Sequence, residues 1–390
     1  MPEGHVAPGY EPVREAFERN FTELGELGAA FAAFRGGELV VDLWGGLADR
    51  ETARPWRQDT LQLFFSGTKG MVAICLLMLI ERGKLRLDDP VSRYWPEFGK
   101  PDILVRHLVS HTARMPGIDE PIGVDDLADD TRMAAILAAQ EPSTDPRAAI
   151  SYHALSYGWL CGELIRRIDG RSAGRFFAEE VAGPLGVEIW IGLPEEYEPR
   201  VSTLELAPDW GQAAARAPDA FAQDPLLRSV WGNPVLFSRD EPFFWNERRI
   251  HAAELPGANG IATARGVAKV YGCLATGGAP LLSPETIALG RSELSAGHDL
   301  LNDLHWRFGV GFQLPSESIY FGPAGPAGDG FGHGGAGGSH HGAWPGLGVG
   351  YSYAMNQMRD SARPDPRAKA LLEALYAAAT RERGGHAENA

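Results

Sequence analysis

Several features are scarce or absent in this 390-residue sequence, and each absence excludes a class of protein. The formal net charge is −15, so the sequence lacks the excess of cations with which proteins bind nucleic acids or an anionic membrane surface. The longest apolar run, MVAICLLMLI at 71–80, is too short to span a bilayer. The first residues, MPEGHVAPGYEP, have neither the basic nor the apolar region of a signal peptide, so we expect a cytoplasmic protein.

Cysteine is also scarce, with three widely spaced residues at Cys75, Cys161 and Cys273. Their number is odd, and Cys75 and Cys161 lie within apolar helical patterns, so we expect buried free thiols in a reducing compartment. No spacing of cysteine and histidine resembles a zinc site. We therefore predict a protein with no bound metal and no cofactor.

The scarcity of lysine is informative for a different reason. Five of the 36 basic residues are lysines, at 69, 84, 100, 269 and 369, and the others are arginines. Lys69 lies three residues after Ser66 and just before the apolar run at 71–80. Arginine cannot release its proton in a protein, whereas a partly buried lysine can. Lysine at this position therefore indicates that the side chain has to lose a proton.

Periodicity places strands near both ends of the chain and helices in the middle. Residues 28–49 predict two strands joined at Arg35-Gly36-Gly37, and strands are also predicted after about residue 303 in WRFGVGFQL, SIYFG, FGHGGAGGSHHGAW and LGVGYSYAMNQM. Helices are predicted at 10–25, 67–83, 261–278 and 366–383, and in DILVRHLVSHTARMPG, MAAILAAQ and LSYGWLCGELIRRIDG.

This distribution predicts an α/β fold plus an all-α part. Residues 1–60 and 290–390 would form one discontinuous α/β domain, an antiparallel sheet flanked by the N- and C-terminal helices. Residues 61–289 would form an inserted, mostly helical domain. A ligand cleft is expected between the two parts.

Ser66 and Lys69 form an S-x-x-K arrangement at the start of a predicted helix. Residues three apart lie on the same helix face, so the lysine amine can hydrogen-bond the serine hydroxyl. Burial and the positive N-terminal end of the helix lower the pKa of such a lysine, which lets it act as a base. The pattern alone is a weak signal, because S-x-x-K occurs by chance in many proteins and a solvated lysine is the more common case.

The surrounding residues sharpen this interpretation. The segment DTLQLFFSGTKG places small residues around the serine, and it resembles the nucleophile motif of the serine β-lactamase and penicillin-binding-protein superfamily. It is similar above all to the class C-like branch, which includes family VIII carboxylesterases and related acyltransferases. LVSHTARMPG, LPGANGIATARGVAKVYGCLATGG and FGVGFQL also resemble family segments, so the resemblance extends over about residues 25–360. One departure is Arg114, which stands where the family usually has glycine, and its role stays open.

The resemblance implies a β-lactamase-like fold and a catalytic tyrosine. Tyr152, in SYHALSYGW, takes the place of the family's tyrosine, which would share the proton of Ser66 and return it to the leaving group. Ala154 stands where the β-lactamases have asparagine. Tyr157 is the competing tyrosine, and we interpret it as a packing residue because it lies inside an apolar helical pattern.

The family's K-T-G motif corresponds here to His333, Gly334 and Gly335. The resemblance implies that these three residues bind substrate, and that the backbone N–H groups of Ser66 and Ala336 form the oxyanion hole. Glycines in this strand let the backbone approach a bound acyl group. A histidine in place of the lysine suits a less anionic substrate.

Residues 190–258 are irregular and rich in aromatic side chains. Long loops of this kind in a compact chain are usually functional. We therefore expect Trp231, Phe244 and Trp245 in the wall of the substrate pocket, because of the segment in which they lie. The segment could also shield an acyl-enzyme from water.

The implied function is hydrolysis of small-molecule carboxylic esters through an acyl-enzyme. The sequence has no E-x-x-L-N stretch to supply the deacylating glutamate of class A enzymes, so Lys69 and Tyr152 would activate water as well. Loss of the asparagine and of the K-T-G lysine favours esters, with slow β-lactam hydrolysis as a side activity. Two alternatives stay open: an acyltransferase that passes the acyl group to an alcohol or amine, and a catalytically inactive binding protein in which Ser66 is not labelled covalently.

Replacement of Lys69 by arginine tests whether proton loss is its task. Lys69→Arg keeps a cation but removes the ability to release a proton, so we expect an intact fold and no ester turnover. Circular dichroism and an esterase assay check the two expectations, with Lys84→Arg as a control for the same substitution elsewhere. An active Lys69→Arg variant refutes the assignment.

Overall fold

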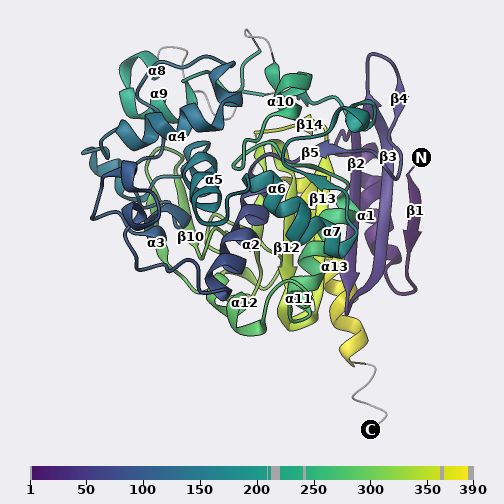
Figure 1. Ribbon diagram of the computed structural model, residues 1–390. Helices are drawn as coiled ribbons and strands as arrows, with labels where there is room; N and C mark the ends of the chain where they lie inside the picture. The colour runs from purple at the N-terminus through teal and green to yellow at the C-terminus, as the bar shows by residue number, and fades with distance from the viewer. Residues whose placement is uncertain (1, 209, 212–219, 240–242, 361–363, 385–390) are drawn as a thin grey trace.

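A computed structural model describes residues 2–208, 210–211, 220–239, 243–360 and 364–384. Its main sheet is antiparallel, with strand order β1-β3-β2-β13-β12-β11 and β4 paired to β3 (Figure 1). These strands are β1 (Glu3–Val6), β2 (Gly28–Arg35), β3 (Glu38–Asp49), β4 (Arg54–Pro55), β11 (Phe331–Gly334), β12 (His340–Trp344) and β13 (Val349–Met355). The other strands are β5 (Gln62–Leu63), β6 (Ile189–Trp190), β7 (Glu205–Leu206), β8 (Ile261–Ala262), β9 (Ser295–Asp299), β10 (Leu304–Phe308) and β14 (Gln357–Met358).

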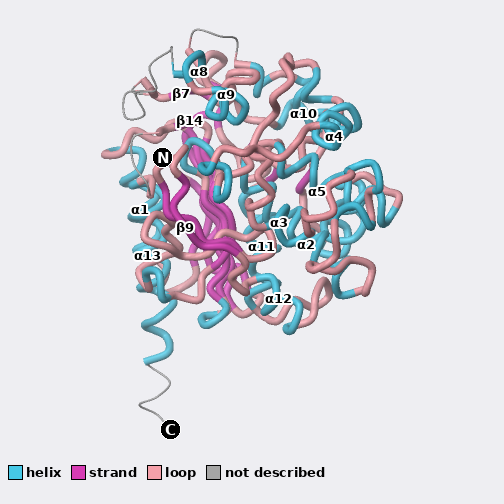
Figure 2. Tube along the Cα trace, turned by 90° about the vertical axis from the view of Figure 1, so that its left-hand side faces the viewer, coloured by secondary structure: helices cyan, strands magenta, loops and turns pink. Residues whose placement is uncertain are grey.

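Helices cover both faces of this sheet. The helices of the described residues are α1 (Glu11–Thr22), α2 (Thr68–Glu81), α3 (Val105–Val109), α4 (Asp130–Ala139), α5 (Ser156–Asp169), α6 (Ala173–Phe177), α7 (Gly183–Leu185), α8 (Ala220–Gln223), α9 (Pro225–Trp231), α10 (Arg248–Ala252), α11 (Ala264–Ala275), α12 (Pro284–Gly290) and α13 (Pro366–Gly384). Figure 2 shows α1 and α13 on one side of the strands, and α11 and α2 on the other. The antiparallel sheet flanked by the N- and C-terminal helices is therefore confirmed.

The predicted hairpin at 28–49 is present as β2 and β3. Its turn contains Gly36 and Gly37, whose φ angles are 58° and 90°. Two successive residues with positive φ match the twist of the strands they join, and glycine adopts this conformation without steric strain. This hairpin is local in sequence, so its turn residues were sufficient to predict it.

The two faces of the sheet bury different kinds of side chain because successive residues of a strand point to opposite sides. Phe31, Tyr351 and Tyr353 pack with Phe17 of α1 and Leu371 of α13. On the other face, Ala32 of β2 and Ala354 of β13 pack with Ala268 of α11. Large rings thus separate the sheet from α1 and α13, whereas small residues let α11 lie close to it.

The position of α11 bears on the division of the chain. A Cβ on Gly350 of β13 would lie 1.9 Å from the backbone nitrogen of Gly272, so α11 packs directly on the strand. This helix falls within the segment 61–289, for which the sequence predicts a separate, mostly helical domain. The domain boundaries at residues 60 and 290 therefore stay a prediction. The helix α11 belongs to the segment 61–289 by sequence, but it packs on the sheet.

Some predicted elements differ from the structure, and the strand predicted in WRFGVGFQL ends at Phe308, the last residue of β10. The predicted helix in DILVRHLVSHTARMPG is limited to α3, because His111 and Arg114 beyond it adopt φ angles of 61° and 59°, which a right-handed helix cannot contain. The strand predicted in SIYFG is wrong: its backbone N–H of Ile319 donates to Ser316 Oγ, and the carbonyl of Phe321 accepts from the Trp344 indole. Side chains thus take hydrogen bonds that a neighbouring strand would need.

A buried ion cluster ties α13 to the sheet. The Arg367 guanidinium is fully buried, with Nη1 2.8 Å from Glu26 Oε1 and Nη2 2.8 Å from Asp365 Oδ2. Glu26 also accepts a hydrogen bond from the Tyr353 hydroxyl, and Arg367 Nη2 donates to the carbonyl oxygen of Gly337 at 3.3 Å. Breaking a buried pair by removing one partner costs about 3–5 kcal/mol, so this cluster fixes where the last helix and the turn after β11 meet.

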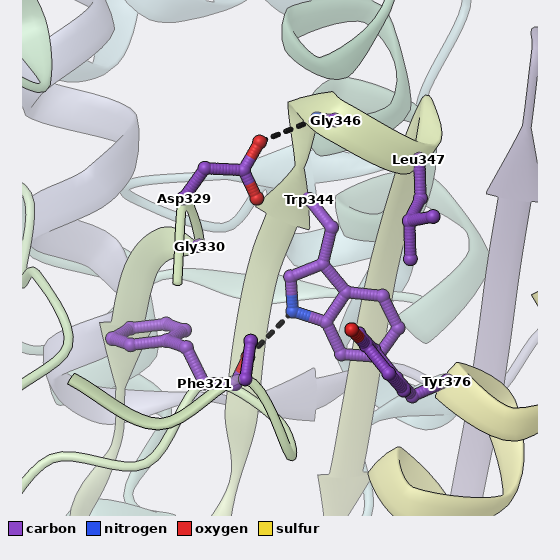
Figure 3. A pocket seen from close by; sticks show the side chains of 8 residues that line it. Phe321, Asp329, Gly330, Trp344, Gly346, Leu347 and Tyr376 are labelled. Carbon is purple, nitrogen blue, oxygen red and sulfur yellow. Dashed lines mark hydrogen bonds between the residues drawn. The ribbon is translucent and has the colours of Figure 1, made fainter. Parts of the chain in front are cut away.

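A cavity of about 210 Å³ lies at the C-terminal end of β12, on the side of the sheet that α13 covers (Figure 3). Its wall includes the Trp344 indole, the Tyr376 ring of α13 and Leu347, with Asp329 hydrogen-bonded to the backbone of Gly346. None of its lining residues is one that the sequence assigns to a site. Among the described helices, none is both long and apolar enough to cross a membrane.

Candidate active site

Ser66 lies in a tight turn directly before α2. The turn is the 3₁₀ segment Phe65–Gly67, and within it Ser66 is half-buried while its two neighbours are buried. Phe65 has a φ of 45°, an unusual conformation for a residue with a side chain. Its ring packs edge-on against Trp245 at 5.1 Å and Phe237 at 5.5 Å between centroids. Packing of the Phe65 ring thus holds the strained turn that presents the serine.

The Lys69 side chain is fully buried and contacts three oxygen atoms. Its Nζ lies 3.2 Å from Ser66 Oγ, 2.7 Å from the carbonyl oxygen of Ala154 and 2.7 Å from that of Gly257. A neutral amine has two N–H donors and one lone pair. Because carbonyl oxygens only accept hydrogen bonds, both N–H groups of the neutral lysine donate to Ala154 and Gly257. Its lone pair then faces the serine hydroxyl.

A close contact between α5 and a loop brings the Gly257 carbonyl to the lysine. A Cβ on Gly158 of α5 would lie 2.3 Å from the nitrogen of Gly257, so neither position has room for a side chain between them. Asn259 fixes the same loop, since its Nδ2 donates to the carbonyl oxygens of Ile250 and Ala253. The sequence marked LPGANG only as a family-like segment, and the structure shows that it supplies a hydrogen-bond acceptor to Lys69.

The surroundings of Lys69 favour its neutral form. Burial lowers the pKa of Lys69 well below its ordinary value of 10.5. Burial also lowers the pKa of His153 to about 4, and those of His111 and His333 well below 6.5. A positive charge on Lys69 lowers the pKa of all three histidines further. Because a histidine side chain is either neutral or positive, none of these three neighbours stabilises a protonated Lys69. Across the described ranges, no group of three or more His, Cys, Asp and Glu side chains is arranged to hold a metal ion.

The ring of Tyr152 lies beside the lysine, with its centroid 4.8 Å from Lys69 Nζ. The Tyr152 backbone N–H donates to Asp299 Oδ2 at 2.8 Å, and this fully buried carboxylate also accepts from Trp306 Nε1. The Tyr152 ring stacks on Trp306 at 5.2 Å and packs against His111 at 4.9 Å between centroids. The structure thus brings together the three predicted catalytic side chains. It adds Asp299 and Trp306, which sequence reasoning missed, as the groups that hold the tyrosine.

Tyr157 occupies a different environment from Tyr152. It is fully buried, its ring stacks on His111, and its hydroxyl donates to the backbone carbonyl of Lys69 at 3.5 Å. Burial raises the pKa of its phenol well above 10.0. These contacts fit the packing role that the sequence indicated.

The end of β11 runs against the turn that carries Ser66. A Cβ on Gly335 would lie 2.4 Å from the carbonyl oxygen of Phe64, so only glycine allows this approach. Gly334, Gly335 and Ala336 are half-buried, as Ser66 is. Ser66 and the segment 334–336, which the sequence predicts to bind substrate, therefore lie next to each other, and both are partly accessible to solvent.

The direction of successive N–H groups along β11 shows where that of Ala336 points. The N–H groups of Gly332 and Gly334 face away from β12 and are bonded to Gln313, at 3.2 Å to its carbonyl oxygen and 3.0 Å to its Oε1. The N–H of Gly335 faces the other way and donates to the Ser339 carbonyl at 2.9 Å. Gly335 is extended, with φ −116° and ψ 159°. Alternation therefore places the Ala336 N–H on the outer side, where β11 is the edge of the sheet.

His333 lies behind this edge and not on it. Its side chain is 0% exposed, and its Nδ1 lies 2.7 Å from the carbonyl oxygen of Gly334. Because a carbonyl only accepts, Nδ1 carries the proton and Nε2 is left with a lone pair. Nε2 has no hydrogen-bond partner among the described residues. The family's lysine is thus replaced by an uncharged acceptor, and contact between His333 and a substrate stays a prediction.

The two glycines of SGTKG let the sheet and α11 pack against the start of α2. A Cβ on Gly67 would lie 2.7 Å from His341 Cδ2, and a Cβ on Gly70 would lie 2.2 Å from the Tyr271 hydroxyl. His341 is 1% exposed, pairs with His333 across the β11–β12 hairpin, and has Nδ1 2.8 Å from Ser352 Oγ. Sequence reasoning assigned no role to His341. The register of β11 with β12 puts His341 on the same face as His333, and the residue pattern alone does not reveal that register.

Two of the predicted pocket aromatics, Phe244 and Trp245, lie behind the turn of Ser66, where Trp245 packs on Phe65. Phe244 and Trp245 are 3% and 1% exposed, and the Trp245 indole donates to the carbonyl of Leu236, so they offer a substrate little surface. Trp231 is half-buried at the end of α9. Phe237, which the sequence did not single out, is half-buried and contacts Phe65 directly. Parts of this segment, 209, 212–219 and 240–242, lie outside the described residues.

The structure also accounts for Arg114. Its φ of 59° explains why glycine suits this position. The Arg114 guanidinium is directed at the backbone: Nε donates to the Ser143 carbonyl at 2.7 Å and Nη2 to the Asp145 carbonyl at 2.8 Å. The arginine therefore braces the loop before Tyr152.

Comparisons with known proteins bear on the family and the fold of this chain. The sequence profile of the Beta-lactamase family matches residues 17–375. Esterase/beta-lactamase LipL of Mycobacterium tuberculosis is 33% identical over 370 residues, which cover 91% of this chain and 83% of LipL. A solved structure of a family VIII carboxylesterase has a TM-score of 0.86 and 38% identity, covering 97% of this chain and 100% of that one. A penicillin-binding protein homologue from Caulobacter crescentus has a TM-score of 0.85 and 35% identity, with the same coverage.

The contact between Gly70 and Tyr271 can be tested by a double-mutant cycle. Gly70→Ala places a methyl group 2.2 Å from the Tyr271 hydroxyl, so we expect the free energy of unfolding to fall by about 1–3 kcal/mol. In the Tyr271→Phe background the nearest ring carbon is 3.4 Å away, an ordinary contact, and most of the loss should be recovered. Urea denaturation of the four proteins measures the coupling. Equal effects of Gly70→Ala in both backgrounds contradict the contact.

Proposed function

This chain belongs to the Beta-lactamase family and is a serine hydrolase of carboxylic esters, and we propose that Ser66 is the nucleophile through which it acts. The observation that carries the proposal is the set of contacts of Lys69 Nζ. Two carbonyl acceptors take both N–H groups of the neutral amine and leave its lone pair for the Ser66 hydroxyl. Lys69 is accordingly the base that takes the proton of Ser66, and Tyr152 shares that proton with Lys69.

Acylation then requires one proton to move from the serine to the departing alcohol. Ser66 Oγ attacks the ester carbonyl carbon, and Lys69 accepts the hydroxyl proton. The backbone N–H groups of Ser66 and Ala336 bind the negatively charged carbonyl oxygen, which suits the outward direction inferred for the Ala336 N–H. Tyr152 gives its hydroxyl proton to the alkoxy oxygen as the carbon–oxygen bond breaks, and it takes the serine proton from Lys69 in exchange. A neutral alcohol leaves the acyl-enzyme, and Lys69 and Tyr152 return to their starting protonation states.

Deacylation repeats the same steps with water as the nucleophile. Water gives its proton to the Lys69 and Tyr152 pair, attacks the acyl carbonyl, and releases the carboxylic acid and the Ser66 hydroxyl. An alcohol or amine that replaces water at this step would make the enzyme an acyltransferase, which is the second candidate. The name of LipL includes β-lactamase, and slow β-lactam hydrolysis is the side activity that we propose on that basis.

The uncharged surroundings support small, neutral esters as substrates. His333 is neutral where the family has lysine, so the site offers no cation at that position to a substrate carboxylate. Ala154 replaces an asparagine and contributes its backbone carbonyl to Lys69 instead. Trp245 packs on Phe65 and Phe237, and Phe244 packs on Trp245, so these rings would shape the wall behind Ser66. A place for Trp231 in the pocket wall stays a prediction. A cytoplasmic location, and the absence of nucleic-acid or membrane partners, stay predictions from the sequence.

Intact-protein mass spectrometry during turnover of p-nitrophenyl butyrate tests the nucleophile. The wild type should release a burst of p-nitrophenol and gain a butyryl group, and Ser66→Ala should show neither, because the covalent intermediate cannot form. Ser110→Ala, which changes a buried serine outside the proposed mechanism, should behave as the wild type. Absence of an adduct, with equal rates in wild type and Ser66→Ala, contradicts the proposal. Added alcohols and amines sort hydrolase from transferase by the products that form.

The pH dependence of acylation tests the state of Lys69. The base is active when neutral, so kcat/KM should rise with pH and level off above the pKa of Lys69, which burial holds well below 10.5. Measurements above pH 5 leave His153 and His341 neutral, since their pKa values are about 4 and about 3. Lys100→Arg is the control, because burial also lowers the pKa of Lys100 and its loss should not change the profile. A rise centred at the ordinary pKa of lysine contradicts a buried neutral base.

A further inference from the structure

We propose that His111 is a positioning residue that holds Tyr152 in place for proton transfer to the departing alcohol. The imidazole of His111 accepts a hydrogen bond from one backbone neighbour of Tyr152, and its carbonyl accepts one from the other. Its ring also packs on the tyrosine ring. This inference rests on the proposed function, because it assumes that Tyr152 delivers the proton.

Three successive backbone N–H groups around Tyr152 are hydrogen-bonded, and two of them are bonded to His111. The N–H of Ser151 donates to the carbonyl oxygen of His111 at 3.5 Å, and that of His153 donates to His111 Nδ1 at 3.0 Å. The N–H of Tyr152 itself donates to Asp299. Ser151 is extended, with φ −144° and ψ 131°, so successive N–H groups point to opposite sides. His111 therefore holds one side of this segment and Asp299 holds the other.

The hydrogen bond from His153 defines the protonation state of the His111 ring. An acceptor nitrogen carries no proton, so Nδ1 has a lone pair and the single proton of the neutral ring is on Nε2. A ring protonated at Nδ1 would present a second donor to the His153 N–H and lose this bond. Because both residues are fully buried, that N–H would then lack an acceptor, which is unfavourable. The support of Tyr152 therefore requires a neutral imidazole.

The His111 ring also relates Tyr152 to the helix that carries Lys69. It packs on the Tyr152 ring at 4.9 Å between centroids and stacks on the Tyr157 ring at 5.3 Å. The Tyr157 hydroxyl in turn donates to the backbone carbonyl of Lys69. Phe308 of β10 packs against the same imidazole at 4.2 Å. Interiors packed as closely as this leave a ring little room to move, so the imidazole helps to fix where Tyr152 lies relative to α2.

The loop that carries His111 is itself anchored. The carbonyl oxygen of Ser110 accepts a hydrogen bond from Ser295 Oγ of β9 at 2.7 Å. The N–H of Gly311 donates to the Val109 carbonyl at 3.0 Å. His111 has a φ of 61°, a left-handed conformation that histidine and asparagine adopt more readily than most residues with a side chain. The support that His111 gives to Tyr152 therefore comes from a fixed backbone.

Two butyrate esters separate proton delivery from other effects. p-Nitrophenolate leaves as a stable anion and needs no proton, whereas ethoxide is a poor leaving group, so ethyl butyrate depends more strongly on Tyr152. Both esters form the same acyl-enzyme, and kcat/KM covers the steps through acylation. The ratio of their kcat/KM values, ethyl over p-nitrophenyl, therefore reports proton transfer and is independent of the fraction of folded enzyme. Titration at constant pH follows the release of butyric acid.

His111→Leu removes both the Nδ1 acceptor and the ring. We expect the ratio to fall by about 10- to 100-fold, the effect of a slight displacement of a catalytic group. His111→Asn has nearly the same shape as leucine, but it suits a positive φ and offers Oδ1 to the His153 N–H, so it should recover about fivefold of that loss. Circular dichroism first shows that each variant is folded. An unchanged ratio in His111→Leu, or equal ratios in the two variants, overturns the inference.

His107 provides a matched control in α3. Its Nδ1 accepts a hydrogen bond from the backbone N–H of Leu104 at 3.1 Å, a bond of the same kind that involves neither Tyr152 nor its neighbours. His107→Leu should therefore keep the ratio of the wild type. A fall in His107→Leu equal to that in His111→Leu means that loss of any such bond near the site has this effect, and overturns the inference.

A double-mutant cycle shows whether His111 acts through Tyr152. Tyr152→Phe should lower the ratio, and His111→Leu in that background should lower it no further. A further fall of the same size overturns the inference. His111→Asn gives the same cycle if His111→Leu does not fold, and its smaller fall should likewise disappear.

Failure of the proposed function can be distinguished from failure of this inference. If wild-type Ser66 acquires no butyryl group, or Tyr152→Phe leaves the ratio unchanged, the proposed function has failed, and this inference fails with it. If Ser66 is acylated and Tyr152→Phe lowers the ratio while His111→Leu does not, only the role of His111 has failed.

Discussion

A lysine amine with no exposed surface is the constraint on which the rest of this structure depends. Burial of an ammonium ion without a carboxylate is strongly unfavourable, so Lys69 is stable inside only as a neutral amine with every hydrogen-bonding position used. Ala154 precedes α5 and Gly257 belongs to a distant loop, yet their carbonyls meet at one nitrogen. The third position is the Ser66 hydroxyl. The need to satisfy one buried amine thus brings together three separate parts of the chain.

Close packing of backbones makes this convergence possible. Gly158 and Gly257 let α5 and the loop touch, and Gly67 and Gly70 do the same for α2 against the sheet and α11. Side chains at these positions would move the carbonyls or the histidines by more than a hydrogen bond can tolerate. Rigid placement of reactive groups is what differential stabilisation of a transition state requires. The small residues around the site therefore serve its precision as much as its accessibility.

The parts of this arrangement that could be predicted are those encoded locally. S-x-x-K at 66–69 and the glycines of the 28–49 hairpin act within one turn, so the residues themselves reveal them. The Gly257 carbonyl and Asp299 approach the site from far along the chain, and a backbone carbonyl leaves no signature in a side-chain pattern. SIYFG has the apolar and aromatic residues of a strand, but its hydrogen bonds go to side chains that the sequence does not place beside it. His341 could be placed only once the register of β11 with β12 was known.

The ion cluster at Arg367 has a consequence for the order in which activity appears during synthesis. Arg367 donates to the carbonyl of Gly337, next to Ala336, so the turn proposed to bind the oxyanion is held by the first residues of the last helix. Ser66 and Lys69 leave the ribosome long before that helix does. A nascent chain would therefore carry the proposed nucleophile and base before Arg367 is present to hold the backbone turn opposite them. Docking of the helix that carries Arg367, and not synthesis of the Ser66–Lys69 pair, would be the step that completes the proposed site.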